Sequence, residues 1–362
     1  MRKRKSVEPI VSYFIKPYID YPEQDVLINN ISESIEIGYV VKSHTLVKAS
    51  IPLNNLFEHV FVTGSTGSGK TYTVSRIVNE LIARKHSVTT IIFDWHGEYR
   101  NLLREYDYIE PFKNSINIFS DIDSLVDLLV DTLDLTHPQA YLLEKIVKQS
   151  NREISDIDTL INIVENYVDE SSWMRESRLS LLRKLSLLNR SRYVELFNSG
   201  NNGCLDRIIN RDGGVYVIDL YQINNTLVRR IYMVFLLKKI LNLALSNLGR
   251  VKSLIVIEEA QNIVDREKPV KLLLSMLAEV RKFGVGLIIV SQSPFKLMED
   301  VMINTNTKIV HSLKSSIDLD IINKVLYLPE EYRRILPYLD VGEAILYTRG
   351  FKKPVLIKVD TN

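Results

Sequence analysis

The sequence predicts an α/β fold with a mostly parallel sheet, and two observations support this prediction. Apolar runs of strand length alternate with helical segments from residue 58 onward. These runs are also apolar almost throughout, which is typical of strands in a sheet that helices cover on both faces. The expected strands are residues 59–64, 88–95, 115–119, 214–220, 253–259, 285–292 and 307–313.

Two regions depart from this alternation. Residues 1–57 contain short β-like runs at 26–32 and 36–43, separated by turns, and are predicted to form a small β-rich N-terminal region. Residues 121–200 have helical periodicity, polar outer positions and no strand candidate. Because this pattern is typical of helices with one buried face, we expect a helical subdomain inserted into the sheet domain.

The sheet domain is expected to comprise residues 58–120 and 201–362. Its last apolar runs, at 343–350 and 354–360, are predicted to form a hairpin or two edge strands. A chain of 362 residues is long enough for this arrangement.

Composition excludes several classes of protein. The net charge is only +2, so no overall basic field indicates a nucleic-acid binder. Cys204 is the only cysteine, which excludes a disulfide framework and suits a reducing compartment. The most apolar long helix, at 231–247, carries Lys238 and Lys239 at its centre and falls short of a membrane span. We therefore expect a cytoplasmic protein that has no membrane segment.

A phosphate-binding loop is the most specific motif in the chain. Residues 64–71 match the full G-x-x-x-x-G-K-[ST] pattern, between an apolar run and a helical pattern at 72–85. The glycines let backbone N–H groups turn toward phosphate. Lys70 is expected to reach the β- and γ-phosphates of ATP, and Thr71 to hold Mg²⁺. The alternative is a chance glycine-rich turn. The expected nucleotide-binding residues are Gly64, Ser65, Thr66, Gly67, Ser68, Gly69, Lys70, Thr71 and Tyr72.

Polar side chains follow two other expected strands. Glu258 and Glu259 end one of them; in P-loop ATPases the first acid holds Mg²⁺, usually through water, and the second orients the attacking water. Aspartate is the common first acid, so Glu258 is a departure that keeps the carboxylate. Gln292 ends another strand, where it could contact the γ-phosphate or the attacking water. The alternatives are acids that stabilise a helix N-terminus and a polar residue that begins a loop.

The strand expected at 88–95 ends in an unusual group of ionisable residues. Asp94, His96, Glu98 and Arg100 all lie within seven positions of one another. One interpretation is a functional cluster beside the nucleotide. The other is a structural cluster, in which Asp94 caps a turn and Arg100 pairs with Glu98.

Together these motifs resemble the HerA/FtsK superfamily of ring-forming DNA translocases, and HerA-type ATPases most closely. The resemblance covers about residues 36–360 and includes an acid followed by His-Gly-Glu-Tyr at 96–99. It implies a RecA-like P-loop ATPase fold, a homohexameric ring and sequence-independent binding of double-stranded DNA. The other matching segments are 37–41, 58–71, 214–220, 256–261, 279–294, 303–310 and 342–350.

The resemblance also implies roles for individual residues. His96 and Glu98 are expected to face the γ-phosphate region or the neighbouring subunit. Arg281 matches the family's Arg-Lys pair before a Gly-Val strand, and it could act on the γ-phosphate of the neighbouring subunit. Alternatively, Arg281 only caps the end of a helix. The expected catalytic residues are therefore Lys70, Glu98, Glu259, Arg281 and Gln292.

Two departures from the family pattern bear on partners and chemistry. HerA proteins carry a longer N-terminal β-barrel that docks a nuclease, whereas about 57 residues precede the phosphate loop here, so the nuclease partnership is in doubt. Ser293 stands where the family usually has arginine. Any role of that arginine is absent or served elsewhere.

The function expected from these features is an ATP-driven ring motor that translocates or unwinds double-stranded DNA, in repair and recombination or in plasmid or viral DNA handling. The alternatives are a conjugation- or packaging-type DNA pump, a phosphotransferase for a small molecule and a nucleotide-gated binding module. Local basic groups are expected to be solvated faces rather than groove readers. These groups are Arg2 to Lys5, Arg229–Arg230, Lys238–Lys239, Arg333–Arg334 and Lys352–Lys353.

Overall fold

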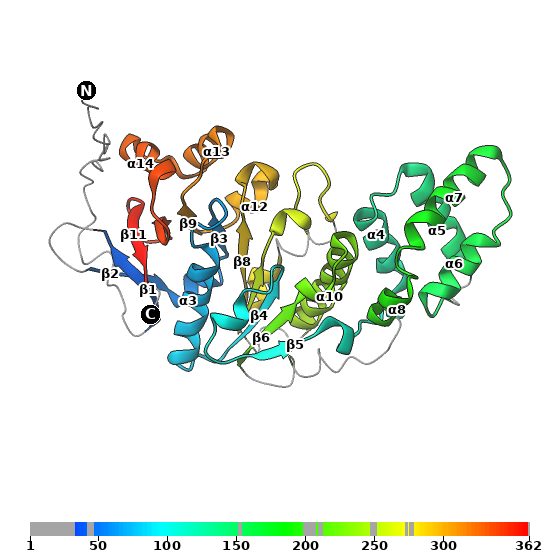
Figure 1. Cartoon of the computed structure of the whole chain (residues 1–362), viewed down its shortest axis with the longest axis horizontal. Coiled ribbons are helices and arrows are strands. Elements are labelled where there is room, and N and C mark those ends of the chain that lie inside the picture. Colours follow the sequence, from blue (N-terminus) through cyan, green and yellow to red (C-terminus); the bar gives the residue numbers. More distant parts are fainter. Residues whose placement is uncertain are drawn as a thin grey trace, which may run out of the picture.

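The computed structural model describes residues 33–41, 47–150, 154–197, 208, 213–246, 252–271, 274 and 279–360. The strands in these ranges form one 11-stranded sheet in the order β2-β1-β11-β10-β9-β3-β8-β7-β4-β6-β5 (Figure 1). The strands are β1 (Ser34–Val40), β2 (Val47–Pro52), β3 (Val60–Thr63), β4 (Val88–Asp94), β5 (Asp107–Ile109), β6 (Gly214–Asp219), β7 (Lys252–Ile257), β8 (Val285–Ser291), β9 (Thr307–His311), β10 (Glu343–Tyr347) and β11 (Val355–Val359).

The prediction of a mostly parallel sheet is confirmed. All neighbouring strands from β9 to β5 pair in parallel, and the pairs from β9 to β2 are antiparallel. The register places Thr63 beside Ser291 and Asp94 beside Asp219. The carboxyl ends of the parallel strands therefore meet at one edge, where ligands bind in open α/β sheets.

Two helices cover opposite faces of the sheet. Val60 and Val62 of β3 pack in the same cluster as α3 (Lys70–Ala83), whereas Phe61 belongs to the cluster that contains α10 (Thr226–Ser246). Successive residues of a strand point to opposite faces, so a fully apolar strand is buried only if both faces are covered. This requirement explains the unbroken Val- and Ile-rich runs of the sequence.

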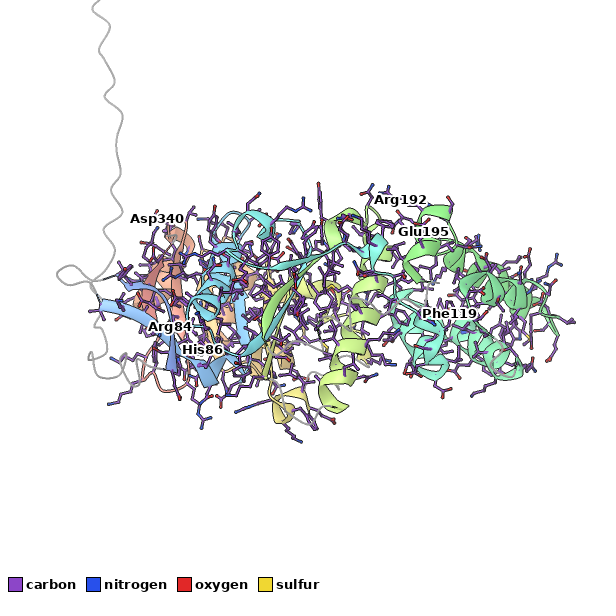
Figure 2. All side chains as sticks on the ribbon, turned by 90° about the horizontal axis from the view of Figure 1, so that it is seen from below. Arg84, His86, Phe119, Arg192, Glu195 and Asp340 are labelled. Carbon is purple, nitrogen blue, oxygen red and sulfur yellow. The ribbon has the colours of Figure 1, made fainter. Side chains whose placement is uncertain are left out.

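The chain forms a group of helices after β5 and before β6 in the sequence, and these helices extend beyond α10 (Figure 1). Figure 2 shows these helices, with Arg192 and Glu195, on one side of the molecule and Asp340 toward the other. Asp121 caps α4 by accepting a hydrogen bond from the Ser124 N–H, and Lys238 of α10 lies 2.7 Å from the same carboxylate. The helices are α4 (Ile122–Thr132), α5 (His137–Gln149), α6 (Ile157–Glu165), α7 (Ser172–Leu185) and α8 (Ser191–Phe197).

Several sequence-based expectations for strands are wrong in detail. Residues 115–119 form no strand, because the Ile116 N–H binds the Leu196 carbonyl and the Asn117 side chain caps a 3₁₀ turn that begins at Ile118. Of the two alternatives for the last apolar runs, the hairpin is confirmed, since β10 and β11 pair antiparallel, and they are not edge strands because β1 and β2 continue the sheet beyond β11. The run at 26–32 lies outside the described residues, and β2 and β5 were not predicted. The division into domains stays a prediction.

Two of the basic pairs predicted to be solvated are instead withdrawn from solvent. Arg229 and Lys238 are buried, and Arg230 and Lys239 are partly buried. The cations of α10 bind carbonyl groups or, for Lys238, a carboxylate, because buried charge needs a partner. Arg2 to Lys5 lie outside the described residues. Among the described helices, none combines the length and the apolar character that a membrane span requires.

Candidate nucleotide site

The phosphate loop connects β3 to α3 through backbone conformations that favour glycine. Gly67 and Gly69 have φ of 75° and 109°, and Gly69 is the residue that precedes the first turn of α3. A side chain at either φ would be strained. Lys70 curls back over the loop, and its Nζ donates to the Gly64 carbonyl at 2.8 Å and the Ser65 carbonyl at 3.1 Å. The loop is therefore folded around the position that a phosphate would occupy.

Glu259 is the centre of a hydrogen-bond network at the end of β7. Its Oε1 accepts a bond from Gln292 Nε2 at 2.7 Å and lies 3.1 Å from His96 Nε2, and Oε2 accepts from Gln261. Its backbone has φ 48°, an uncommon conformation for a side chain of this kind. Burial acts to raise the pKa of Glu259, but the bonds from His96, Gln292 and Gln261 outweigh it and lower the pKa below its usual value. The network therefore holds the ionised carboxylate of Glu259 in one orientation, on a backbone that has an unfavourable φ.

Gln292 connects this carboxylate to the phosphate loop. Its Oε1 accepts a bond from the Thr66 hydroxyl at 3.0 Å, while its amide nitrogen donates to Glu259. A change at the loop can therefore reach Glu259 through a single side chain. Gln292 therefore lies beside the phosphate loop, and its predicted contact with the γ-phosphate or the attacking water stays a prediction.

Glu258 is buried, unlike most carboxylates. Its side chain is 3% exposed, and Oε2 has no hydrogen-bond partner among the described residues. Burial raises the pKa of Glu258 well above its usual value, and the nearby charge of Asp94 adds to this effect. A buried oxygen without a partner fits a cation ligand, because oxygen groups are what Mg²⁺ prefers. Thr71 lines the same cavity, so Thr71 and Glu258 fit the expected Mg²⁺ set.

The turn after β4 separates a structural residue from residues that face the site. The Asp94 carboxylate accepts bonds from the backbone N–H groups of Gly97, Glu98 and Tyr99, so it caps the turn as one interpretation predicted. Glu98 accepts a bond from the Thr71 hydroxyl at 2.8 Å. The predicted pair between Arg100 and Glu98 is wrong.

Arg100 contacts residues of β5 and β6 rather than Glu98. It lies 3.7 Å from the Asp219 carboxylate and stacks over the Tyr108 ring at 4.1 Å. Asp219 ends β6, the neighbour of β4 in the sheet. β6 lies four strands from β3, which carries the phosphate loop, so the spacing of residues 94–100 could not reveal Asp219 as the partner of Arg100.

Arg229 of α10 binds the turn that follows β4, a role that the sequence did not suggest. Its guanidinium donates to the carbonyls of Trp95, Tyr221 and Ile223 and lies 4.9 Å from the Trp95 ring centre. It was grouped with the basic surface pairs because charge alone does not reveal burial. Gln261 was also missed, since an amide two residues after an acid has no specific spacing signal.

A cavity of about 640 Å³ lies at the carboxyl edge of the sheet, and residues of the phosphate loop, the β4 turn and the ends of β7 and β8 line it. Lys70, Thr71, Glu98, Glu258 and Glu259 all line it, as do His96, Gln292 and Tyr72. The structure thus brings together most of the predicted site residues. Tyr72 is 49% exposed, and Val341 is a further lining residue.

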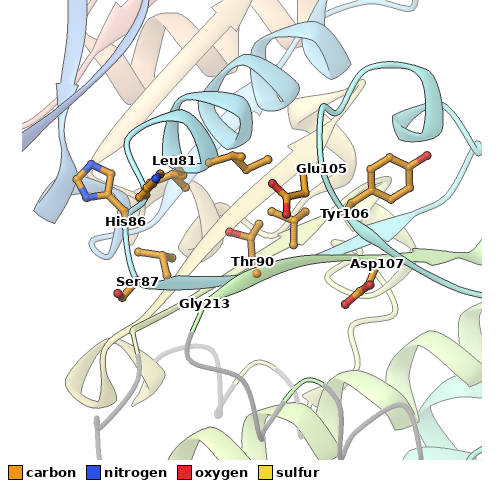
Figure 3. A pocket seen from close by; sticks show the side chains of 13 residues that line it. Leu81, His86, Ser87, Thr90, Glu105, Tyr106, Asp107 and Gly213 are labelled. Atoms are coloured by element: carbon orange, nitrogen blue, oxygen red, sulfur yellow. The ribbon is translucent and has the colours of Figure 1, made fainter.

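A second cavity of about 320 Å³ lies at the opposite edge of the sheet (Figure 3). Thr90 is at its centre, Leu81 and His86 line one side, and Glu105 and Tyr106 line another. No part of the phosphate motif reaches this cavity, because it lies where the parallel strands begin.

Arg281 is the predicted catalytic residue that the structure does not bring to the cavity. It belongs to a 3₁₀ turn (Val280–Phe283) before β8, and its guanidinium lies 2.6 Å from the Glu58 carboxylate. Arg349 lies 2.7 Å from the same oxygen. The whole of β8 separates this cluster from Gln292, a length of about 20 Å at roughly 3.3 Å per residue. Arg281 therefore cannot act on the nucleotide of its own subunit in this arrangement.

Comparison with known proteins gives a family and a fold. Residues 35–240 match the family described as "Helicase HerA, central domain". The chain is 28% identical to the DNA double-strand break repair helicase HerA of Sulfurisphaera tokodaii, over 90% of this chain and 69% of that protein. It is 27% identical to the HerA helicase of Sulfolobus acidocaldarius, with the same shares of both chains.

Solved structures share the fold. VirB4 of Thermoanaerobacter pseudethanolicus superposes with a TM-score of 0.70 at 17% identity, over 91% of this chain and 97% of that one. The plasmid coupling protein TrwB, in a complex with ADP and Mg²⁺, gives 0.63 at 12% identity, over 91% and 95%. The expected RecA-like P-loop fold is confirmed by these likenesses.

The His96–Glu259 pair makes a testable contribution to stability. The bond to Glu259, opposed by burial, raises the pKa of His96 above its usual value. Because the pKa is higher in the folded state, protonated His96 contributes its full stabilisation below about pH 6.5, the usual pKa of histidine. This contribution is lost as the pH rises through the pKa of the folded state. Glu259 stays ionised across this range because its pKa is lowered. We compare the unfolding midpoint of wild type with that of His96→Gln at each pH. Wild type should have the higher midpoint, and its advantage should be about 1–3 °C larger at pH 5.5 than at pH 9.

The measurement is thermal unfolding of both proteins in a series of buffers at fixed ionic strength. His137→Gln, at the exposed start of α5, serves as the control for loss of a histidine elsewhere. A difference between wild type and His96→Gln that does not change with pH would contradict the ion pair.

Proposed function

The chain belongs to the family of the HerA helicase central domain, and from this premise we propose that it is an ATP-driven motor that translocates double-stranded DNA. The observation that carries the proposal is the convergence of Lys70, Glu259 and Gln292 on one cavity. A loop for phosphate, a carboxylate for water and an amide that joins them are the parts that ATP hydrolysis requires.

Lys70 and the loop bind the phosphates of ATP. The Lys70 ammonium now bonds two loop carbonyls, and a β- or γ-phosphate oxygen would replace them with a charge-assisted bond. Burial lowers the pKa of Lys70, while Glu259, Glu258 and Glu98 oppose this effect. A desolvated cation interacts more strongly with a phosphate than a solvated one.

Thr71 and Glu258 would hold Mg²⁺ beside the phosphates. When bound, this ion neutralises charge on the transferred phosphoryl group. The Glu258 oxygen without a partner and the Thr71 hydroxyl are the donors that the chain offers. Glu98 accepts a hydrogen bond from the Thr71 hydroxyl and so orients the lone pairs of that hydroxyl oxygen.

Glu259 is the general base. Its lowered pKa keeps it ionised at neutral pH, and three donors fix the direction in which it can accept a proton from water. Gln292 shares its amide between Glu259 and Thr66, so it positions the base relative to the γ-phosphate end of the loop. His96 stabilises the charge of the base through the same oxygen atom.

The working assembly that we propose is a homohexameric ring around duplex DNA. Such a ring tracks the phosphate backbone with few cations per subunit, which agrees with the net charge of +2. The process served is DNA repair or recombination, in line with the names of the HerA relatives. A nuclease partner would require a docking surface that the described residues do not identify.

A conjugation- or packaging-type DNA pump is the second candidate. The fold is shared with VirB4 and TrwB at low identity, which does not distinguish the two uses. A phosphotransferase for a small molecule has less support, since the cavity offers no second cation cluster among its described lining residues.

The proposal is tested first by the ATPase rate with and without duplex DNA. We expect wild type to hydrolyse ATP faster with duplexes of any sequence, because the bound strand is recognised through its phosphates. Lys70→Ala should lose hydrolysis by at least about 100-fold, since it removes a cation aimed at the transferred phosphate. Lys148→Ala, an exposed lysine of α5, is the control and should match wild type. Hydrolysis by Lys70→Ala at near wild-type rate would show that the loop is not the site.

A second pair of variants separates the two acids. Glu259→Gln should bind ATP with unchanged affinity and lose at least about 100-fold in kcat, because the amide keeps the shape and lacks the base. Glu258→Gln should instead raise the Mg²⁺ concentration needed for half-maximal rate. ATP binding and rates are measured on the same samples. The opposite assignment of the two phenotypes would mean that the roles of the acids are exchanged.

A mixing experiment tests Arg281 as a residue that acts in the neighbouring subunit. Arg281→Ala and Lys70→Ala should each be nearly inactive, and a mixture should regain part of the DNA-free ATPase rate. Recovery follows because some interfaces then combine Lys70 of one chain with Arg281 of the next. Arg349→Ala is the matched control, since Arg349 binds the same Glu58 oxygen. Subunit exchange is shown first with labelled chains, and an active Arg281→Ala protein would limit Arg281 to its bond with Glu58.

A further inference from the structure

His311 lies beneath the phosphate loop at the end of β9, the strand beside β3. Its side chain is fully buried. The Nδ1 atom lies 2.9 Å from the Glu343 carbonyl, which can only accept, so Nδ1 carries the ring proton. The Nε2 atom is then an acceptor, and it lies 2.8 Å from the Thr73 hydroxyl. One tautomer of a neutral imidazole satisfies both contacts.

The same strand end holds the loop through the backbone. The Ser65 N–H donates to the Ser312 carbonyl at 2.8 Å, and the Gly342 N–H donates to the Ser68 carbonyl at 3.0 Å. Thr73 lies in the first turn of α3, three residues after Lys70. Contacts from β9 and from the turn before β10 therefore fix the loop on both sides of its lysine.

Two glycines of the loop pack closely against the end of β9 and the turn before β10. A Cβ placed on Gly64 would lie 2.6 Å from His311 Cβ, and one on Gly69 would lie 3.0 Å from Gly342 N. Burial lowers the pKa of His311 to about 4, so the imidazole remains a neutral acceptor at physiological pH. The contact with Thr73 is thus a permanent part of the loop's support.

We propose that His311 is a positioning residue that holds Thr73, and with it the start of α3, in the arrangement that binds the phosphates of ATP. This inference rests on the proposed nucleotide site. It adds a residue that makes no contact with the nucleotide cavity itself, since His311 is absent from its lining. It also joins the loop to the segment between β9 and β10, which carries α13 (Ser316–Leu326) and α14 (Glu330–Ile335).

Two conservative variants separate the two ring nitrogens. In His311→Gln the side-chain carbonyl reaches the position of Nε2 and can accept the Thr73 hydroxyl bond. In His311→Asn the amide reaches only the position of Nδ1 and can bond the Glu343 carbonyl. We expect Asn to raise the Kd for ATP by about tenfold, the effect of one lost hydrogen bond, with kcat within about twofold of wild type. Gln should keep the Kd within about threefold.

Binding and rate together distinguish positioning from general damage. A partly unfolded sample loses active molecules, so its apparent kcat falls while Kd stays constant, whereas a loosened loop raises Kd. His59→Asn is the matched control at the opposite edge of the sheet. His59 is also buried and accepts a bond from the Leu287 N–H through Nδ1, which asparagine can replace at this residue's φ of 67°. Its Kd for ATP should equal that of wild type.

Thr73→Val completes the test by removing the hydroxyl from the other side of the bond. The Thr73 hydroxyl also lies 3.1 Å from the Gly69 carbonyl, so Thr73→Val should raise Kd at least as much as His311→Asn does. The double variant should be no weaker than Thr73→Val, because that variant already lacks the bond to His311. This arm also serves if His311→Asn does not fold. Additive effects in the double variant, or an unchanged Kd in both single variants, would overturn the inference. Loss of ATP binding by wild type itself would instead contradict the proposed function.

Discussion

The site depends on one constraint, which is the need to keep several carboxylates ionisable at a buried strand edge. Asp94 ends β4, and Glu258 and Glu259 follow the neighbouring β7, so these three carboxylates share one poorly solvated strand edge where negative charges repel one another. The three carboxylates differ in their hydrogen-bond partners. Asp94 receives three backbone N–H groups, Glu259 receives three side-chain donors, and Glu258 keeps one oxygen, Oε2, with no hydrogen-bond partner among the described residues, although the Tyr99 hydroxyl lies near enough to act against the rise in its pKa that burial causes. This unequal treatment separates a structural acid, a poised base and an acid that fits a cation.

Holding these groups requires support that lies outside the cavity. Arg229 fixes the turn that presents His96 and Glu98, and it does so through carbonyl bonds and ring contacts rather than through a salt bridge. His311 supports the loop in a comparable way from the other side. Both are buried polar residues whose bonds are directed at the main chain or at one hydroxyl. Such networks set geometry because their members have few alternative partners.

The sequence predicted the parts of this arrangement that depend on local pattern. The phosphate loop, the apolar strands and the acids at 258–259 each have a fixed spacing or a period that survives in any context. The sequence could not predict which distant residues meet. Arg229 and Lys238 were expected at the surface because charge usually indicates exposure, yet a carboxylate, carbonyls and an aromatic ring offset their burial. Likewise, 115–119 has β-like composition, but the Leu196 carbonyl in α8 and the Asn117 cap decide its conformation.

The charges that line the cavity support the proposal that a neighbouring subunit completes the site. Three carboxylates, Glu98, Glu258 and Glu259, face Lys70 and His96 as the cationic side chains among its described lining residues. The triphosphate of ATP would add several negative charges to this balance. Mg²⁺ and the N–H groups of the loop would offset part of the excess, and in the proposed ring a cation from the neighbouring subunit would offset more. Arg281 and Arg349 lie at the far edge of the same sheet, where Glu58 holds both. In the proposed ring, one subunit's carboxyl edge would face the far edge of its neighbour, so Glu58 would hold Arg281 in place until the neighbour's nucleotide competes for it, while the Arg349 side chain binds only Glu58 among the described residues.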